Sequence, residues 1–139
     1  MIVYHFRAEK LQQVVDAHPC EAYNAFEEYI GIHTALTLPD TAIVATSGSM
    51  VYAEKAMKFL SERTHIVYLE ATLETIERRV ARRPDRGISF APGETLADVY
   101  HRRVPMYRRW AHRTFDANDD HRRVIAARLA ESLESEGVI

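Results

Sequence analysis

Cysteine is almost missing from this sequence, since Cys20 is the only one among 139 residues. A single thiol cannot form a disulfide within the chain, and cysteine-poor sequences are typical of reducing compartments. Long apolar runs are missing too: the longest are a handful of residues, whereas a membrane-spanning helix needs about 20. The first residues, Met1 to His5, lack the basic and apolar regions of a secretory signal. These absences predict a cytoplasmic protein without a membrane segment.

Glycine is scarce, and none of the five glycines precedes a lysine. The phosphate-binding P-loop motif, Gly-x-x-x-x-Gly-Lys followed by Ser or Thr, is therefore absent from these residues. The seven histidines show none of the paired spacings that metal sites use. We therefore assign no metal ligand from the sequence.

Net charge is small, at minus two, but the charges are unevenly distributed. Thirteen of the fifteen arginines lie between Arg78 and Arg128, while residues 1–77 carry five basic and eleven acidic side chains. Guanidinium groups bind phosphate oxygens two at a time, so an arginine-rich half indicates a polyanionic ligand. Solvated helix faces explain the same distribution equally well. The sequence leaves both interpretations open.

Two short apolar segments, residues 42–45 and 66–69, are separated by about one helix. This spacing is typical of a βαβ unit with a parallel, doubly buried sheet, and it predicts an α/β fold. Thr46 to Ser49 form a loop of small residues after the first of these segments. Open α/β sheets bind ligands at this position, so we expect the functional site near this loop.

The remaining pattern predicts one helix-rich domain over residues 1–139. Helices are expected over about residues 3–17, 21–36, 51–63, 73–83 and 119–135, with a long one from about residue 94; strands are expected over 42–46, 65–70 and 114–117. Tyr23, Phe26, Tyr29 and Ile30 are expected on one face of the second helix. Pro105 is expected to kink or divide the long helix, and residues 85–93 to form a mobile loop.

Several motifs, in this order and spacing, resemble the shikimate kinase family of small P-loop kinases. Ala45 to Ser49 matches that family's Ala-Thr-Gly-Gly-Gly loop, and Arg103 to Arg108 matches its Arg-x-Pro-x-Tyr-Arg. Residues 21–27 lie where the family has Glu-x-Phe-Arg-x-x-Glu, and residues 74–86 match a helix with an adenine-contacting arginine followed by a lid arginine. The resemblance covers nearly the whole chain. It implies ATP-dependent phosphorylation of a hydroxyl on a small acidic metabolite, with Mg²⁺.

The resemblance also implies roles for individual residues. Arg86, in a lid over about residues 84–95, is the implied catalytic arginine and contacts the nucleotide, and Arg79 is the implied adenine contact. Arg103 is implied to bind the substrate carboxylate. Its place among inward-facing residues also points to an anionic partner, because a buried unpaired charge is costly. The other implied substrate contacts are Asn24, Ser47, Gly48 and Ser49.

Simpler roles remain open for several of these residues. Gly48 is either a plain turn with positive φ or part of the substrate loop. Ser47 and Ser49 could equally cap the following helix. Arg79 could equally lie on a solvated helix face, since its helix carries other arginines.

The sequence departs from the family pattern at three places. The family's substrate-binding arginine is Asn24 here, two of the three loop glycines are Ser47 and Ser49, and the lid's Arg-Pro-Leu-Leu is Arg86 to Ser89. Each change touches the substrate pocket more than the nucleotide side. Weak or no use of shikimate itself is therefore expected.

The family's P-loop and catalytic aspartate lie in segments that would precede Met1. In the family's strand order, 2-3-1-4-5, the missing first, central strand would lie between residues 42–46 and 65–70, which leaves backbone groups of the core unpaired. We therefore expect an incomplete P-loop kinase-like fold, a three-layer parallel sheet with flanking helices, in an N-terminally truncated chain that folds poorly and is inactive alone. The complete protein is expected to be a monomer.

Two other functions stay open: a non-catalytic anion or nucleic-acid binding module, and a degenerate kinase that serves as a partner subunit. RNA-binding surfaces interleave exposed aromatics with basic residues. Here Tyr100, Tyr107 and Trp110 fall on the apolar side of their helix instead. Nucleic-acid binding is therefore the less favoured interpretation.

Overall fold

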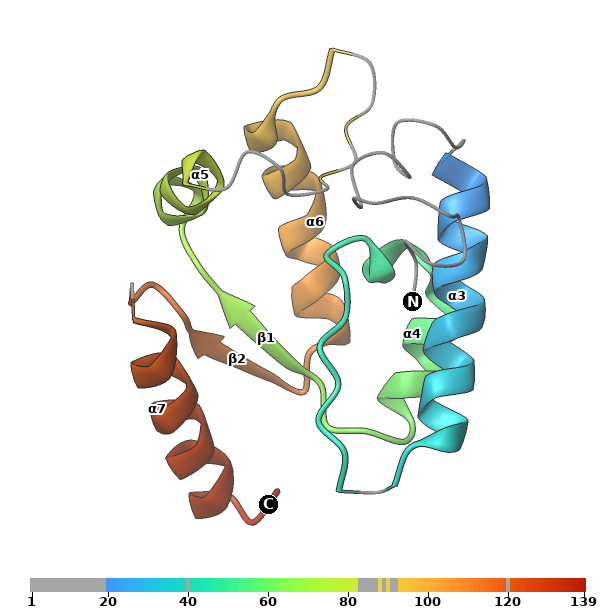
Figure 1. The fold of residues 1–139 in the computed structure, drawn as a ribbon, viewed down its shortest axis with the longest axis vertical. Coiled ribbons are helices and arrows are strands. Elements are labelled where there is room, and N and C mark those ends of the chain that lie inside the picture. Colours follow the sequence, from blue (N-terminus) through green and yellow to red (C-terminus); the bar gives the residue numbers. More distant parts are fainter. Residues whose placement is uncertain (1–19, 40, 83–87, 89, 91–92, 120) are drawn as a thin grey trace.

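The structure, a computed structural model, describes residues 20–39, 41–82, 88, 90, 93–119 and 121–139. Its elements in chain order are α3 (Cys20–Thr37), the short 3-10 helix η1 (Met50–Tyr52), α4 (Glu54–Ser61), β1 (Val67–Glu70), α5 (Leu73–Ala81), α6 (Leu96–Trp110), β2 (Arg113–Asp116) and α7 (Arg122–Ser135) (Figure 1). The helix expected over residues 3–17 and most of the loop expected over 84–95 lie outside the described residues.

β1 and β2 form a two-stranded parallel sheet. The register pairs Val67 with Arg113 and Glu70 with Asp116. Two parallel strands need a crossover connection, and α5 and α6 lie between these strands in the chain, as the sequence predicts. The loops that follow the two strands therefore meet at one edge of the sheet, where the Thr72 amide donates to Oδ1 of Asn118 at 2.9 Å.

The prediction of a strand over residues 42–46 is wrong, because this segment pairs with no strand among the described residues. Ile43 is 93% exposed, and Leu69 in β1 is 49% exposed. The prediction of a doubly buried sheet is therefore wrong as well. A strand becomes buried on both faces only when helices and further strands cover it, and the described sheet has two strands. The three-layer sheet expected from the sequence is a two-stranded α/β arrangement in the part of the chain that the structure describes.

The core lies between α3, η1 and α4. Its buried side chains are Met50, Ala53, Ala56, Met57 and Leu60, with Ile32, Ala35, Ile66 and Trp110 packed against them. Ala56, Met57 and Leu60 recur at helical spacing, so they share one face of α4. Gly31 of α3 allows close packing, because a Cβ there would meet the Met50 side chain at 3.2 Å. Tyr29, expected on the inner face of α3, is instead 63% exposed.

Side-chain hydrogen bonds cap the starts of α5 and α6. Thr72 caps α5 by accepting from the Thr75 amide at 3.3 Å, and Thr95 and Asp98 form a reciprocal capping box at the start of α6. α6 runs unbroken through Pro105, so the division of this helix that Pro105 was expected to cause does not occur. Pro105 is exposed, and water can therefore satisfy the carbonyl that loses its amide partner.

Among the described residues, no helix has the length and the apolar character needed to cross a membrane.

Candidate active site

The loop of residues 46–49 packs against a buried carboxylate of α3. Glu27 is 2% exposed, and its Oε1 accepts a hydrogen bond from the Ser47 hydroxyl. The Ser49 hydroxyl lies 3.3 Å from that of Ser47. The other carboxylate oxygen, Oε2 of Glu27, has no hydrogen-bond partner among the described residues. Buried carboxylates are costly without partners, so this oxygen is suited to accept a hydrogen bond from a ligand.

The opposite side of the same loop is held by α6. The Tyr107 hydroxyl donates to the Gly48 carbonyl at 2.7 Å, and its ring stacks on Tyr68 with 5.1 Å between centroids. Burial raises the pKa of the Tyr107 phenol, so Tyr107 remains a donor at neutral pH. The loop is therefore clamped between a carboxylate of α3 and a phenol of α6.

Gly48 is required by close approach and not by its backbone angle. Among the described glycines only Gly93 and Gly137 have positive φ, so the positive φ expected for Gly48 is wrong. A Cβ at Gly48 would lie 3.1 Å from the Tyr107 hydroxyl and 3.3 Å from Nη1 of Arg103. A side chain here would require these neighbouring atoms or the loop to move by a few tenths of an ångström.

Arg103 reaches the same place from α6. Its side chain is half-buried, and its Nε donates to the Tyr52 hydroxyl at 3.1 Å. Nη1 faces Gly48, and Arg103 is close enough to Tyr107 to oppose the rise in that phenol's pKa. None of the ion pairs between described residues involves Arg103. A half-buried guanidinium beside a small-residue loop can bind a ligand carboxylate in a bidentate manner.

The structure thus brings together four of the residues that the sequence proposed as substrate contacts. Ser47, Gly48, Ser49 and Arg103 meet directly, and Asn24 lies on α3 three residues before Glu27, which places both on one side of the helix. Arg86, the proposed lid arginine, lies outside the described residues.

Two residues of this cluster were not proposed as contacts from the sequence. Glu27 lies three and four positions from Ile30 and Tyr23, on the face predicted to be apolar, and a carboxylate on that face was a usable signal. Tyr52 gave no signal in the sequence, because a tyrosine next to a buried segment is common in folded proteins.

Arg79 lies at the carboxyl edge of the sheet. Its Nη2 donates to the backbone carbonyls of Ala117 and Asp119, at 2.7 and 2.6 Å. These residues belong to the loop that follows β2, where parallel sheets bind nucleotides. Arg79 therefore holds this loop, and the alternative of a purely solvated arginine is wrong.

Ion pairs within the chain explain part of the uneven charge distribution. Arg108 pairs with Glu70 at 2.7 Å and Arg109 with Glu54 at 2.9 Å, so arginines of the second half meet acids of the first. These pairs account for some of the arginine excess without a polyanionic ligand.

The described residues contain no group of three or more His, Cys, Asp and Glu side chains able to hold a metal ion. The residues around loop 46–49 therefore do not by themselves form a magnesium site.

A family model described as shikimate kinase matches residues 6–134 of the chain. The chain belongs to the shikimate kinase family. Among curated relatives it is similar to shikimate kinase 2 of Pectobacterium carotovorum, with 27% identity over 121 residues that span 84% of this chain and 70% of that protein. It is also similar to shikimate kinase 2 of Pectobacterium atrosepticum, with 29% identity over 76% of this chain and 64% of that protein. For shikimate kinase 1 of Escherichia coli, identity is 32% over 72% of this chain and 60% of that protein.

The chain therefore spans roughly two thirds of the length of the curated relatives that it matches. No solved structure matches it significantly. In this member of the shikimate kinase family, the loop motif of residues 45–49 and the Arg103 to Arg108 motif lie against each other, as one shared site requires.

Proposed function

We propose that the protein containing this chain transfers a phosphoryl group from ATP to a hydroxyl of a small acidic metabolite. The observation that carries this proposal is the convergence of Glu27, loop 46–49 and Arg103 from three separated segments. Membership of the shikimate kinase family supports the reaction class. Such a reaction depends mostly on positioning and charge stabilisation.

The substrate end of the site suits one carboxylate and several hydroxyls. Arg103 provides the cation for the carboxylate, and Oε2 of Glu27, which has no hydrogen-bond partner among the described residues, accepts from a substrate hydroxyl. Asn24 stands where the family has an arginine, so the pocket has one positive charge fewer. We therefore propose that shikimate itself is a weak substrate.

The nucleotide end is proposed at the loop that Arg79 holds after β2. Arg79, Asn118 and the Thr72 amide link the loops following both strands, and this fixed edge suits the adenine of ATP. Arg86 is proposed to meet the transferring phosphoryl group from the lid. Because the described residues do not form a magnesium site, we assign no magnesium ligand to them and derive no step through the metal.

The exposed apolar side chains support a further strand beside β1. Ile43, Val44 and Leu69 are 93%, 47% and 49% exposed, on segments that flank the position of the family's first strand. Exposed apolar residues on neighbouring segments are typical of a surface that another element covers. We propose that a strand and P-loop from outside these 139 residues occupy this position and supply the phosphate-binding amides. On this proposal, residues 1–139 alone are inactive.

Arg86→Ala in the full-length protein tests the kinase proposal. In a lid, this arginine meets charge that develops in the transition state, so kcat should fall by about 100-fold or more with little change in KM for ATP. Arg123→Ala, an exposed change on α7, is the matched control for loss of one positive charge.

An RNA titration at two salt concentrations distinguishes the basic-module alternative. On a polyanion-binding surface, Arg86→Ala would only weaken RNA binding and reduce its salt dependence by about one phosphate contact. If kcat is unchanged and only this salt dependence falls, the proposed function is wrong.

A further inference from the structure

Tyr52 joins two neighbouring arginines of α6. Its hydroxyl oxygen accepts from Nε of Arg102 at 2.8 Å and from Nε of Arg103 at 3.1 Å. Both guanidinium groups also lie over its ring, with 5.5 and 5.2 Å between Cζ and the centroid. A phenol oxygen has two lone pairs, so these two donors use its whole accepting capacity.

Sharing one acceptor is unusual for adjacent helical residues. Positions i and i+1 point about 100° apart on a helix and do not normally face each other. Two guanidinium groups also repel each other when they are brought together. The shared oxygen of Tyr52 therefore holds Arg102 and Arg103 on the same side of α6.

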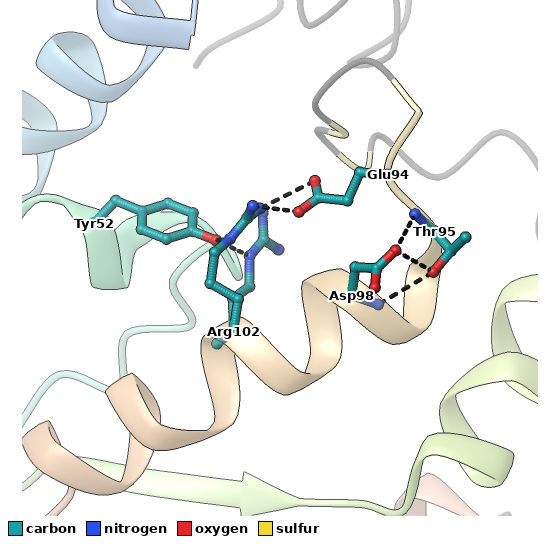
Figure 2. A network of polar contacts seen from close by, with 6 residues as sticks. Tyr52, Glu94, Thr95, Asp98 and Arg102 are labelled. Carbon is teal, nitrogen blue, oxygen red and sulfur yellow. Dashed lines mark hydrogen bonds and ion pairs between the residues drawn. The ribbon is translucent and has the colours of Figure 1, made fainter.

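A carboxylate completes the arrangement on the side of Arg102. Arg102 Nη2 donates to Oε2 of Glu94 at 3.1 Å, and its Nη1 pairs with the other oxygen of the same carboxylate (Figure 2). The Glu94 side chain is 9% exposed and that of Arg102 is 44% exposed, so the carboxylate is the shielded member of the pair.

Glu94 is fixed to the start of α6. It directly precedes Thr95, whose amide donates to the Asp98 carboxylate at 2.9 Å in the capping box (Figure 2). Glu94 and Thr95 are also the last residues of the proposed lid, so the contacts run from the end of the lid through Arg102 and Tyr52 to Arg103.

We propose that Tyr52 is the positioning residue for Arg103, and that Tyr52 and Arg102 couple the lid's end at Glu94 to this arginine. The proposal rests on the proposed function, in which Arg103 binds the substrate carboxylate. A flexible guanidinium loses entropy when it binds an anion, and a side chain that is already held loses less. Tyr52 therefore strengthens substrate binding without touching the substrate.

The kinetic test is Tyr52→Phe in the full-length protein, which keeps the ring and removes the accepting oxygen. KM for the carboxylate substrate should rise by about tenfold, the usual worth of a hydrogen bond to a charged group, while KM for ATP and kcat stay within about twofold. Tyr100→Phe is the matched control, because its hydroxyl donates to the Ala71 carbonyl from the same helix, away from Arg103. It should leave the substrate KM unchanged.

A double-mutant cycle tests the coupling to the lid. Arg102→Gln alone should raise the substrate KM, and it should add little in the Tyr52→Phe background, because both changes break the same chain of contacts. If the two effects simply multiply, the proposed coupling through Tyr52 is wrong.

A measurement independent of activity separates this inference from the proposed function. In nitrogen-15 NMR spectra, the Nε–H signals of Arg102 and Arg103 should be protected from exchange with water, and Tyr52→Phe should remove the protection of both. If no acidic metabolite is phosphorylated, the proposed function fails while these signals still report on the contacts. Unchanged protection of Arg103 in Tyr52→Phe would overturn the inference. A variant in which kcat and the melting temperature fall while both the substrate KM and the ATP KM rise equally would overturn it as well.

Discussion

Gly48→Ala probes the contact between loop 46–49 and α6. The new Cβ would lie 3.1 Å from the Tyr107 hydroxyl, closer than ordinary van der Waals contact, and 3.3 Å from Nη1 of Arg103. The arginine end is flexible and can move, whereas the Tyr107 ring is stacked on Tyr68 and cannot retreat freely. The loop must then shift, and the 2.7 Å hydrogen bond from Tyr107 to the Gly48 carbonyl is stretched or lost.

The expected cost can be worked out from these contacts. A lost hydrogen bond is worth about 1 kcal/mol and mild overpacking about 1 kcal/mol more, so Gly48→Ala should lower the free energy of unfolding by about 2 kcal/mol. Tyr107→Phe removes the nearest atom, and in that background the added cost of Gly48→Ala should fall below about 1 kcal/mol. Urea unfolding of the full-length wild type, both single variants and the double variant gives the four values. An equal cost of Gly48→Ala in both backgrounds would refute the assignment of this glycine to close approach to Tyr107.

Three further predictions follow from the site and the sheet. Asn24→Arg should restore a second carboxylate contact and lower KM for shikimate by about tenfold in steady-state kinetics, and efficient shikimate turnover by the wild type would contradict the reasoning. Arg79→Ala should release the carbonyl of Ala117 and raise KM for ATP by about fivefold, with KM for the phosphoryl acceptor unchanged; equal changes in both would argue against a nucleotide-side role. Burial, assisted by the charge of Glu70, raises the pKa of Tyr68 from 10.0 to about 12. The folded state therefore holds this proton more tightly, so its stabilising effect is complete below pH 10 and is lost between pH 10 and 12. Urea unfolding across this range should show the loss, and Tyr68→Phe should make it shallower; an identical pH dependence in Tyr68→Phe would contradict the shift.

Much of the helical structure could be predicted from local signals. The helices expected over residues 21–36, 51–63 and 73–83 correspond to α3, α4 and α5, and the strands expected over 65–70 and 114–117 correspond to β1 and β2. These features depend on neighbours within a few positions, and local patterns report on such neighbours directly. The match to family motifs likewise brought Arg103 and loop 46–49 into one site before the structure placed them together.

The errors arose where structure depends on partners far away in the chain. Residues 42–46 have the composition of a strand, but a strand needs a neighbour to pair with, and none lies beside them in the described residues. A turn with positive φ was one of two roles left open for Gly48, whereas its closest constraint is the hydroxyl of Tyr107, 59 residues further along the chain. The contacts of Tyr52 are equally long-range, at 50 and 51 residues, and no local pattern encodes them.

Arg103 and loop 46–49 are proposed to form the acceptor end of a phosphotransferase site. Transfer of labelled phosphate from γ-labelled ATP to small polyols, compared in pairs with and without a carboxylate, tests this role. We expect labelled product from carboxylate-bearing acceptors with the full-length protein, a strong reduction with Arg103→Gln, and no product with residues 1–139 alone. Absence of product from every acceptor with the full-length protein, or equal labelling of acceptors that lack a carboxylate, would contradict it.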